Sequence, residues 1–346
     1  MTPAPFRLGT LEISPGTRQT IDLPVSVLSN HTPITLPVHV IHGSLEGPVM
    51  FISAVVHGDE ILGVEIVRRV IRHSALANIA GTLLAAPIVN AFGLISHSRY
   101  MPDRRDLNRS FPGSDQGSLA SVVADLFMRE VLLKSQYGID LHTAALHRTN
   151  LPQIRIAPDD AALLEMAEVF GPPVVLISKL REGTLRQCAQ DNGVKVLLYE
   201  GGEALRFDEV AIRTGVIGIL RLMTWLGMIT AADRSRGRTP PEVSDSSVWL
   251  RAPEGGILRS ARLPGEHVIQ GEKIGEISDP LGDKSWPVIS GDNGLVIGRT
   301  NLPIVNRGDA LFHIARIKDL ETSRARIGKI GGEIAQAPLF DEDEII

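Results

Sequence analysis

The chain has 346 residues, of which 43% are hydrophobic and 22% are charged, and its formal net charge is −5. This length is sufficient for one large domain and a small one, and the composition is that of a globular protein. Because the net charge is negative and no long basic run is present, the sequence offers no support for nucleic-acid binding or for a membrane-surface role. The single cysteine, Cys188, excludes an intrachain disulfide and a cysteine-rich metal site, which leaves His and carboxylate as metal ligands.

The N-terminus, residues 1–5, lacks the basic start and the apolar segment of a signal peptide. No apolar run in the sequence is long enough to span a membrane. We therefore expect the protein to be cytoplasmic.

Strands and helices are predicted to alternate over residues 1–229. Residues 48–56 are an almost continuous apolar run, which is typical of a strand buried on both faces of a helix-covered sheet. Other strands are expected at 8–13, 20–27, 35–42, 82–89, 137–141, 174–177 and 195–199. Helical spacing of apolar residues indicates helices at 63–72, 118–133, 161–169 and 207–226. This order predicts an α/β domain with a mixed sheet flanked by helices, preceded by N-terminal strands over 1–45.

The pattern changes after residue 229. Residues 230–247 are rich in Arg, Ser, Asp and Pro and are predicted to be a linker. Residues 248–316 contain two similar units of short apolar runs and glycines, at 252–277 and 290–314, which predict a small pseudo-symmetric all-β domain. Residues 317–346 form a charged C-terminal extension, either a helix or a tail.

A candidate metal site begins at His57-Gly58-Asp59-Glu60, where a buried strand ends and a helix starts. A His and a carboxylate three residues apart on such a turn can reach one ion, and Gly58 lets the backbone turn. His142, in Asp140-Leu141-His142-Thr143, ends another strand and is the candidate third ligand. The H-x-x-E pair alone is a weak signal, and looser arguments would also admit His73, His97, His147 and His313.

Two polar segments add to this group. Residues 99–113 are dense in Arg and carry Leu107 and Phe111 as anchors, so they are either an ordered site loop or a solvated surface loop. Glu200 follows an apolar strand and precedes two glycines, which favours either a position in a cleft or a turn-capping role.

Together these motifs resemble the succinylglutamate desuccinylase/aspartoacylase family, a branch of the zinc carboxypeptidase superfamily. The resemblance covers most of residues 45–225, in the order H-G-D-E (57–60), R-Y-x-P-D (99–103), D-L-N-R-x-F-P-G (106–113), D-L-H-T (140–143) and Y-E-G-G (199–202). It implies a zinc-carboxypeptidase-like mixed sheet and one Zn²⁺ per chain. The C-terminal β-region is similar to the biotinyl/lipoyl-like domain of long family members.

The resemblance also implies roles by position. His57, Glu60 and His142 match the zinc ligands, and Glu200 matches the general base that later protonates the leaving amine. Arg99 matches the arginine that stabilises the oxyanion, although Arg104 or Arg105 could take that role because the connection to Asn108 departs from the family spacing.

The family resemblance also implies which residues bind the substrate. Asn108 and Arg109 match the pair that holds a substrate carboxylate. Four further residues are candidates for the pocket or, equally, for a surface loop: His147, Arg148, Asn150 and Arg155.

The expected reaction is zinc-dependent hydrolysis of the amide bond of a small N-acylated amino acid, with zinc lowering the pKa of its water to about 7. Succinylglutamate, N-acetylaspartate and N-acetylated diamino acids are equally open as substrates. Two alternatives remain: a zinc carboxypeptidase acting on peptides, and a non-catalytic ligand-binding relative. Lys284 lacks the setting of a modified carrier lysine, so the β-region is expected to restrict the cleft or to form contacts in a possible homo-oligomer.

Overall fold

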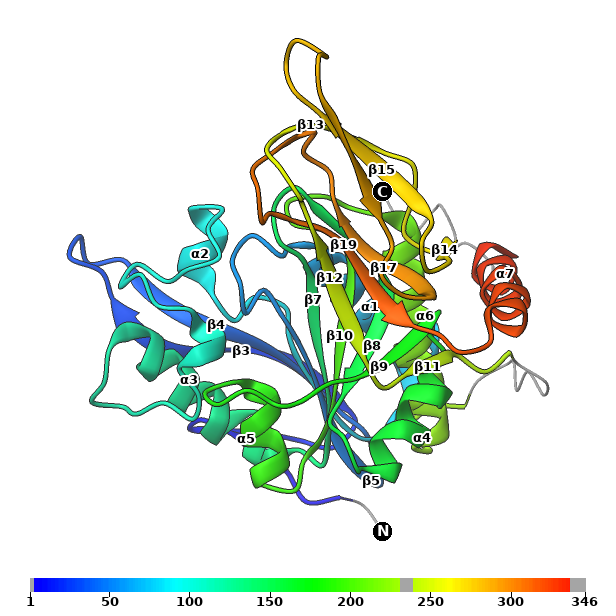
Figure 1. Cartoon of the computed structure of the whole chain (residues 1–346). Helices are drawn as coiled ribbons and strands as arrows, with labels where there is room; N and C mark the ends of the chain where they lie inside the picture. The colour runs from blue at the N-terminus through cyan, green and yellow to red at the C-terminus, as the bar shows by residue number, and fades with distance from the viewer. Residues whose placement is uncertain (1–2, 231–238, 337–346) are drawn as a thin grey trace.

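The computed structural model describes residues 3–230 and 239–336. Its main feature is a mixed sheet of 13 strands with the order β12-β19-β17-β8-β10-β7-β5-β6-β4-β3, to which β9, β11 and β14 are joined (Figure 1). The strands of the N-terminal part are β3 (Thr17–Val27), β4 (Pro33–His42), β5 (Leu45–Ala54), β6 (Ala80–Ala86), β7 (Tyr137–Ala144), β8 (Arg148–Ile156), β9 (Val174–Ile177) and β10 (Lys195–Glu203). A short hairpin, β1 (Phe6–Leu8) and β2 (Leu11–Ile13), precedes them.

Strands β6, β5, β7 and β10 are parallel neighbours and form the centre of the sheet. Their side chains alternate between two cores, because successive residues of a strand point to opposite faces. On β5, Met50 and Ile52 belong to one apolar cluster and Phe51 to the other. The apolar run at 48–56 therefore reflects burial on both faces, as the sequence predicts.

Helices cover both faces. Helices α1 (Leu62–Arg72), α4 (Ala161–Phe170) and α6 (Glu209–Trp225) contribute to the cluster of Met50, whereas α3 (Leu119–Glu130) and α5 (Leu185–Asp191) contribute to that of Phe51. A polar side chain caps the N-terminus of α3, α4, α5 and α6, accepting a hydrogen bond from a first-turn amide in each case; these caps are Ser118, Asp160, Thr184 and Asp208. A short helix, α2 (Ala91–Ile95), follows β6.

The predicted α/β class is confirmed, and the differences are local. The sequence predicts no element at residues 148–156, yet these residues form β8, which lies antiparallel to β10. β8 begins with three polar residues and also contains Gln153 and Arg155, so its apolar signal is weak. Helices α2 and α5 are short enough to give little periodicity.

The stretch at 230–247 is not irregular throughout. Residues 242–244 form β11 (Glu242–Ser244), which pairs in parallel with β9. Residues 231–238 of the predicted linker and 337–346 of the C-terminal extension, including the acidic end, lie outside the described residues. Residues 320–336 of the extension form helix α7 (Leu320–Gln336).

The C-terminal region is all-β and its two units exchange strands. Its strands are β12 (Ser247–Arg251), β13 (Gly256–Ser260), β14 (His267–Val268), β15 (Lys273–Ser278), β16 (Ser285–Ile289), β17 (Gly294–Thr300), β18 (Ile304–Val305) and β19 (Ala310–Arg316). In the first unit, β13 pairs with β15 of the same unit and with the short strand β18 of the second unit. In the second unit, β17 pairs with β19 of the same unit and with the short strand β14 of the first unit. The internal repeat thus corresponds to two interlocked β units.

This region is continuous with the large sheet, because β17 pairs with β8. The domain boundaries at 229 and 248 remain a prediction, since hydrogen-bonded strands cross between the two parts.

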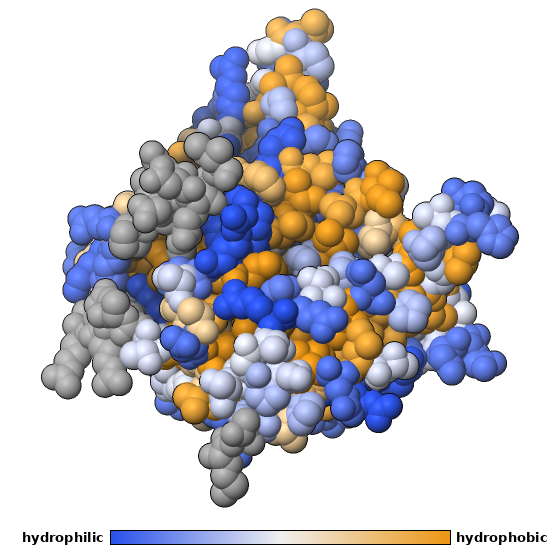
Figure 2. All heavy atoms as spheres, turned by 180° about the vertical axis from the view of Figure 1, so that it is seen from behind, coloured by the Kyte–Doolittle hydropathy of each residue, from blue (hydrophilic) through white to orange (hydrophobic). Residues whose placement is uncertain are grey.

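Apolar side chains gather on the upper part of the back face, where the C-terminal strands lie (Figure 2). The exposed large hydrophobic residues of this region are Leu263, Ile269, Leu281, Ile289, Leu302 and Ile304. A subunit contact would have apolar surface available here, and the homo-oligomer remains a prediction. Within residues 3–230 and 239–336, no helix combines the length and apolar character needed to cross a membrane.

We predict that Gly218→Ala lowers the free energy of unfolding by about 1–3 kcal/mol, because overpacking a core displaces its neighbours. The added methyl group would lie 2.2 Å from Cε1 of Phe170, a fully buried ring. The matched control is Gly328→Ala on α7, where the methyl meets no atom within 4 Å, so helix propensity favours Ala there by up to about 1 kcal/mol. Urea unfolding measures both, and equal destabilisation by the two substitutions would contradict the packing argument.

Candidate active site

His57 and Glu60 lie on the turn between β5 and α1. The chain leaves β5 at Ala54, passes through Val55 with a φ of 56°, and closes the turn with a hydrogen bond from the Glu60 amide to the His57 carbonyl at 3.1 Å. Both side chains therefore project from the C-terminal edge of the parallel strands, where ligands bind in sheets of this type.

Gly58 is required by packing and not by a left-handed turn. Its φ is not positive, but a Cβ atom at this position would lie 2.0 Å from the carbonyl carbon of Gly93 on α2. The close approach of two glycines holds the His57–Glu60 turn against α2, which corrects the reason that the sequence suggested.

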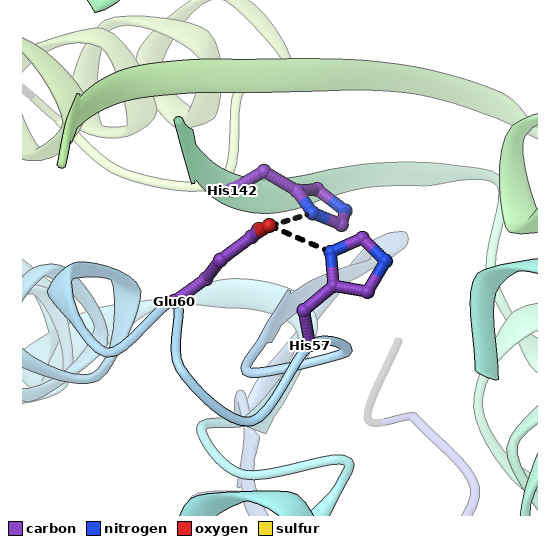
Figure 3. Close-up of side chains that lie close together, drawn as sticks. All are labelled: His57, Glu60 and His142. Atoms are coloured by element: carbon purple, nitrogen blue, oxygen red, sulfur yellow. Dashed lines mark hydrogen bonds and ion pairs between the residues drawn. The ribbon is translucent and has the colours of Figure 1, made fainter. Parts of the chain in front are cut away.

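His142, on β7, completes a buried group with His57 and Glu60. Glu60 Oε1 lies 2.8 Å from Nδ1 of His57, and Oε2 lies 2.7 Å from Nδ1 of His142. Figure 3 shows the Glu60 carboxylate reaching between the two imidazoles. One ligand atom from each of the three residues lies within 4.8 Å of the others, and all three side chains are buried.

The far nitrogen of each imidazole faces a second carboxylate. Nε2 of His57 lies 3.1 Å from Asp106 Oδ1, and Nε2 of His142 lies 2.8 Å from Asp140 Oδ2. Asp140 precedes His142 by two residues on β7, so the two side chains share one face of the strand; Ser53 also donates to Asp140 at 2.8 Å. Such carboxylates fix the orientation of metal-ligating imidazoles and direct the other nitrogen to the ion.

The charges in the group balance. Burial alone lowers the pKa of both imidazoles, but Glu60 and Asp106 raise the pKa of His57, and Asp140 and Glu60 raise the pKa of His142 well above its ordinary value. Burial opposes ionisation of Glu60, and the two imidazoles nevertheless hold its pKa far below the ordinary value. The surrounding carboxylates thus favour the protonated, positively charged form of both imidazoles, whose Nδ1 atoms face the buried carboxylate.

These features fit a divalent cation. An ion of charge +2 can replace the two Nδ1 protons without changing the local charge, and two imidazoles with one glutamate are a known ligand set for catalytic zinc, with ligand distances of about 2.0–2.2 Å. The ligand atoms of the three residues lie within 4.8 Å of one another. Small side-chain rotations would therefore place all three at bonding distance from one ion. His57, Glu60 and His142 are therefore the residues that can hold a metal.

The group opens into a polar cleft of about 300 Å³. Its wall contains Arg99, Asn108, Arg109, Asn150, Arg155, Lys179, Arg181, Arg186, Glu200 and Trp249. All four residues that the family resemblance adds to the metal ligands, namely Glu200, Arg99, Asn108 and Arg109, thus reach one cavity together with them.

Glu200 lies next to His142 across β10 and β7. A register shift follows Glu200 on both sides of β10, and Gly202 has a φ of 71°; bulges of this kind re-aim side chains near active sites. On β8, Asn150 Nδ2 donates to Glu200 Oε2 at 2.8 Å, and Arg155 Nη1 lies 3.4 Å from Oε1. Both carboxylate oxygens are therefore oriented by one neighbouring strand.

Arg99 lies against the metal-binding group. Its Nη1 donates to Glu60 Oε1 at 3.2 Å and its Nη2 to Asp106 Oδ2 at 3.1 Å. Neither Arg104 nor Arg105 is among the described residues that line the cleft, and the Arg105 side chain is 65% exposed. Of the three arginines, only Arg99 therefore contacts the group of His57, Glu60 and His142 among the described residues.

Asn108 and Arg109 form part of a short helical turn at the cleft wall. Asn108 Oδ1 accepts the backbone N–H of Leu185 at 3.0 Å. This fixes the orientation of the amide and leaves Nδ2, which has no hydrogen-bond partner among the described residues, as a donor. The exposed Arg109 donates through Nη1 to the Asn108 carbonyl.

Cations dominate the part of the wall next to these groups, because the segment that follows Ser178 contacts Asn108 through Leu185. Burial, together with the positive charge of Arg155, lowers the pKa of Arg186 to about 10. Lys179 and Arg181 have no ion-pair partner among the described residues, and both are exposed at the mouth of the cleft. The positive charges are therefore incompletely neutralised by the protein itself.

Sequence reasoning missed part of the site. It left open whether Asn150 and Arg155 belong to the pocket or to a surface loop, because it does not predict β8. The segment 178–186 and Trp249 lie in no motif. Asp106 and Asp140 stand inside motifs, yet their contacts with His57 and His142 depend on the fold. Of the looser histidine candidates, none joins the metal-binding group: His73, His97, His147 and His313.

The chain is similar to known proteins over most of its length. The sequence profile of the succinylglutamate desuccinylase/aspartoacylase catalytic domain matches residues 46–226. The N-alpha-acetyl-L-2,4-diaminobutyric acid deacetylase of Halomonas elongata is 25% identical over 302 residues, which cover 82% of this chain and 86% of that protein.

Solved structures extend the likeness. A succinylglutamate desuccinylase/aspartoacylase from Rhodobacter sphaeroides matches with a TM-score of 0.76 and 25% identity, covering 87% of this chain and 96% of the other. The product-bound ectoine utilization protein of Ruegeria pomeroyi matches with a TM-score of 0.77 and 18% identity, covering 87% and 95%, which shows a shared fold.

We predict that His142→Ala removes most of the bound metal, because two ligands remain and the Glu60 charge loses one of its partners. Elemental analysis of the purified protein measures this. His147→Ala is the matched control, since His147 is exposed and outside the group. Retention of one metal ion per chain by the His142 variant would contradict the assignment.

Proposed function

The chain belongs to the succinylglutamate desuccinylase/aspartoacylase family, and on this premise we propose that it is a zinc-dependent deacylase that hydrolyses the amide bond of an N-acyl amino acid. The observation that carries the proposal is the buried group of His57, Glu60 and His142 at the base of a cleft that also contains Glu200. The deacetylase of Halomonas elongata, which spans nearly the same length, supports the same reaction class. We expect the reaction to take place in the cytoplasm.

His57, His142 and Glu60 would hold the metal, since both Nδ1 atoms already face the Glu60 carboxylate. Zn²⁺ at such a site supplies a Lewis acid that lowers the pKa of water and polarises a carbonyl. The protein keeps this ligand set in place through Asp106 and Asp140, which hold the two Nε2 atoms.

Glu200 moves the proton in this mechanism. Its carboxylate accepts a proton from the attacking water and returns it to the leaving nitrogen, so that the amine departs uncharged. Asn150 and Arg155 hold its two oxygens in a defined orientation, and its place at the cleft wall leaves it accessible to substrate.

Three other residues bind the substrate in this proposal. Arg99 directs its guanidinium to the region beside the metal ligands, where negative charge develops on the carbonyl oxygen. Asn108 offers its free amide N–H groups, and Arg109 a cation, to the carboxylate of the amino acid.

The charge of the cleft favours acidic substrates. Six cations, Arg99, Arg109, Arg155, Lys179, Arg181 and Arg186, line it against the carboxylates of Glu60 and Glu200. An ammonium group, such as that of a diamino acid, would be repelled by this surplus, whereas a second carboxylate would be attracted. We therefore propose that the substrate is an acidic N-acyl amino acid, unlike that named for the Halomonas elongata enzyme.

We predict that Glu200→Gln lowers kcat by about 10²–10⁴-fold, because the amide cannot accept the proton of the attacking water. Metal content should stay at the wild-type level, since Glu200 is outside the metal-binding group. Glu203→Gln, three residues further along β10, serves as the control because Glu203 does not line the cleft among the described residues. Unchanged turnover in the Glu200 variant would remove this residue from the mechanism.

We predict a higher kcat/KM for N-acetyl-L-aspartate than for N-acetyl-L-2,4-diaminobutyrate, because these compounds differ in the charge of one side chain. Arg186→Gln should reduce the preference by about 10–100-fold, the range expected when a hydrogen bond to a charged group is lost. Arg105→Gln, outside the cleft, should leave it unchanged. If the wild type prefers the diamino acid, the proposal of an acidic substrate is wrong, whereas the proposed deacylase activity is still supported.

A further inference from the structure

Trp249 brings the C-terminal β-region into the active-site cleft. It lies on β12, at the end of the large sheet, more than 100 residues after the last metal ligand in sequence, and yet it lines the same cleft as Glu200 and His142. Its indole is the largest apolar surface among the described residues of the wall, where the other apolar side chains are Ala144, Ala145 and Leu198. Aromatic side chains in otherwise polar clefts are common contact surfaces for the apolar part of a ligand.

A row of paired residues connects Trp249 with the general base. Trp249 pairs with His313 on β19, His313 with Gly298 on β17, and Gly298 with Asn150 on β8. Asn150 in turn donates to Glu200 at 2.8 Å. The four positions thus lie at one level of the sheet, so Trp249 stands on the Glu200 side of the cleft.

Gly298 leaves space between Asn150 and His313 because it has no side chain. A Cβ atom there would lie 2.7 Å from Oδ1 of Asn150 and 3.5 Å from Cβ of His313. The absence of a side chain leaves room between the aromatic pair and the residue that orients Glu200.

The indole is held in a fixed position. It stacks on His313 with ring centroids 4.6 Å apart and planes inclined by 8°, and the Arg148 guanidinium lies 5.2 Å from its centroid. His313 is itself buried and hydrogen-bonded through Nε2 to Ser247 at 2.8 Å. Burial, together with the charge of Arg155, lowers the pKa of His313 to about 3, so the imidazole remains neutral and the stack is the same across the neutral pH range.

We propose that Trp249 is a specificity-determining residue whose indole contacts the substrate group next to Glu200 and limits its size. This inference rests on the proposed deacylase function and adds a contact from the C-terminal β-region. The Trp249 indole is held by His313 and Arg148 and cannot easily move aside, so a larger substrate group clashes with it. A smaller side chain at position 249 would enlarge the cleft.

The test compares wild type, Trp249→Phe and Trp249→Ala on two substrate series. One series varies the acyl group on L-aspartate from acetyl to propionyl and butyryl, and the other varies the amino acid under a constant acetyl group. In Trp249→Ala, the kcat/KM ratio of the bulky to the small member should rise about tenfold or more in at least one series, as expected for a changed fit of one or two methylene groups. Trp249→Phe should give an intermediate ratio.

The control is Trp225→Ala, because Trp225 lies on α6 and is 43% exposed outside the cleft. Metal content and urea unfolding of each variant verify that the fold is kept. Ratios that stay within about twofold of wild type in both series would overturn the proposal, since a purely structural role would lower all rates together.

A second readout does not depend on turnover. Binding of N-acetyl-L-aspartate should change the intrinsic tryptophan fluorescence of the wild type and of Trp225→Phe, and the change should be lost in Trp249→Phe. A signal that persists in Trp249→Phe, or that is absent from the wild type, contradicts contact with Trp249. Wild-type protein that hydrolyses neither series contradicts the proposed function instead, and the fluorescence change then decides the contact alone.

Discussion

The buried carboxylate of Glu60 joins two segments that are more than 80 residues apart in sequence. It contacts Nδ1 of His57 on its own turn and Nδ1 of His142 on β7, at 2.8 and 2.7 Å. A buried carboxylate is costly unless opposite charge compensates it, and here the two adjacent imidazoles, when protonated, or a divalent cation held by the same three residues would supply that charge. The strand ends, the Gly58–Gly93 contact and the carboxylates of Asp106 and Asp140 all serve to keep this charge balance in one geometry.

The remainder of the site is arranged around this group by neighbouring strands. Glu200 is adjacent to His142 on the parallel strand β10, and the bulge after it aims the carboxylate at the cleft. The next strand, β8, supplies both groups that orient it. A base that is held at two oxygens can act on a substrate without reorganising, so the antiparallel strand β8 would support the proton transfer that we propose for Glu200.

The C-terminal β-region extends this sheet instead of standing apart from it. Because β17 pairs with β8, the two interlocked β units are connected by hydrogen bonds to the strand that orients Glu200, the proposed general base. The same connection carries Trp249 to the cleft. The similarity of 82% and 87% of the chain to two relatives, over 86% and 96% of their own lengths, agrees with an arrangement in which both parts contribute to one site.

The sequence by itself determined the α/β class, the internal repeat and the motif residues that reach the cleft, because apolar periodicity and short motifs are local properties. It also named His57, Glu60 and His142, which the structure brings together. Only the tertiary structure decided which arginine lies beside the metal ligands, that Asn150 and Arg155 hold Glu200, and that Trp249 enters the cleft. These contacts join strands that are distant in sequence, and β8 is hard to recognise as a strand because five of its nine residues are polar. Pairing across a sheet depends on strand order and register, which no single segment of the chain encodes.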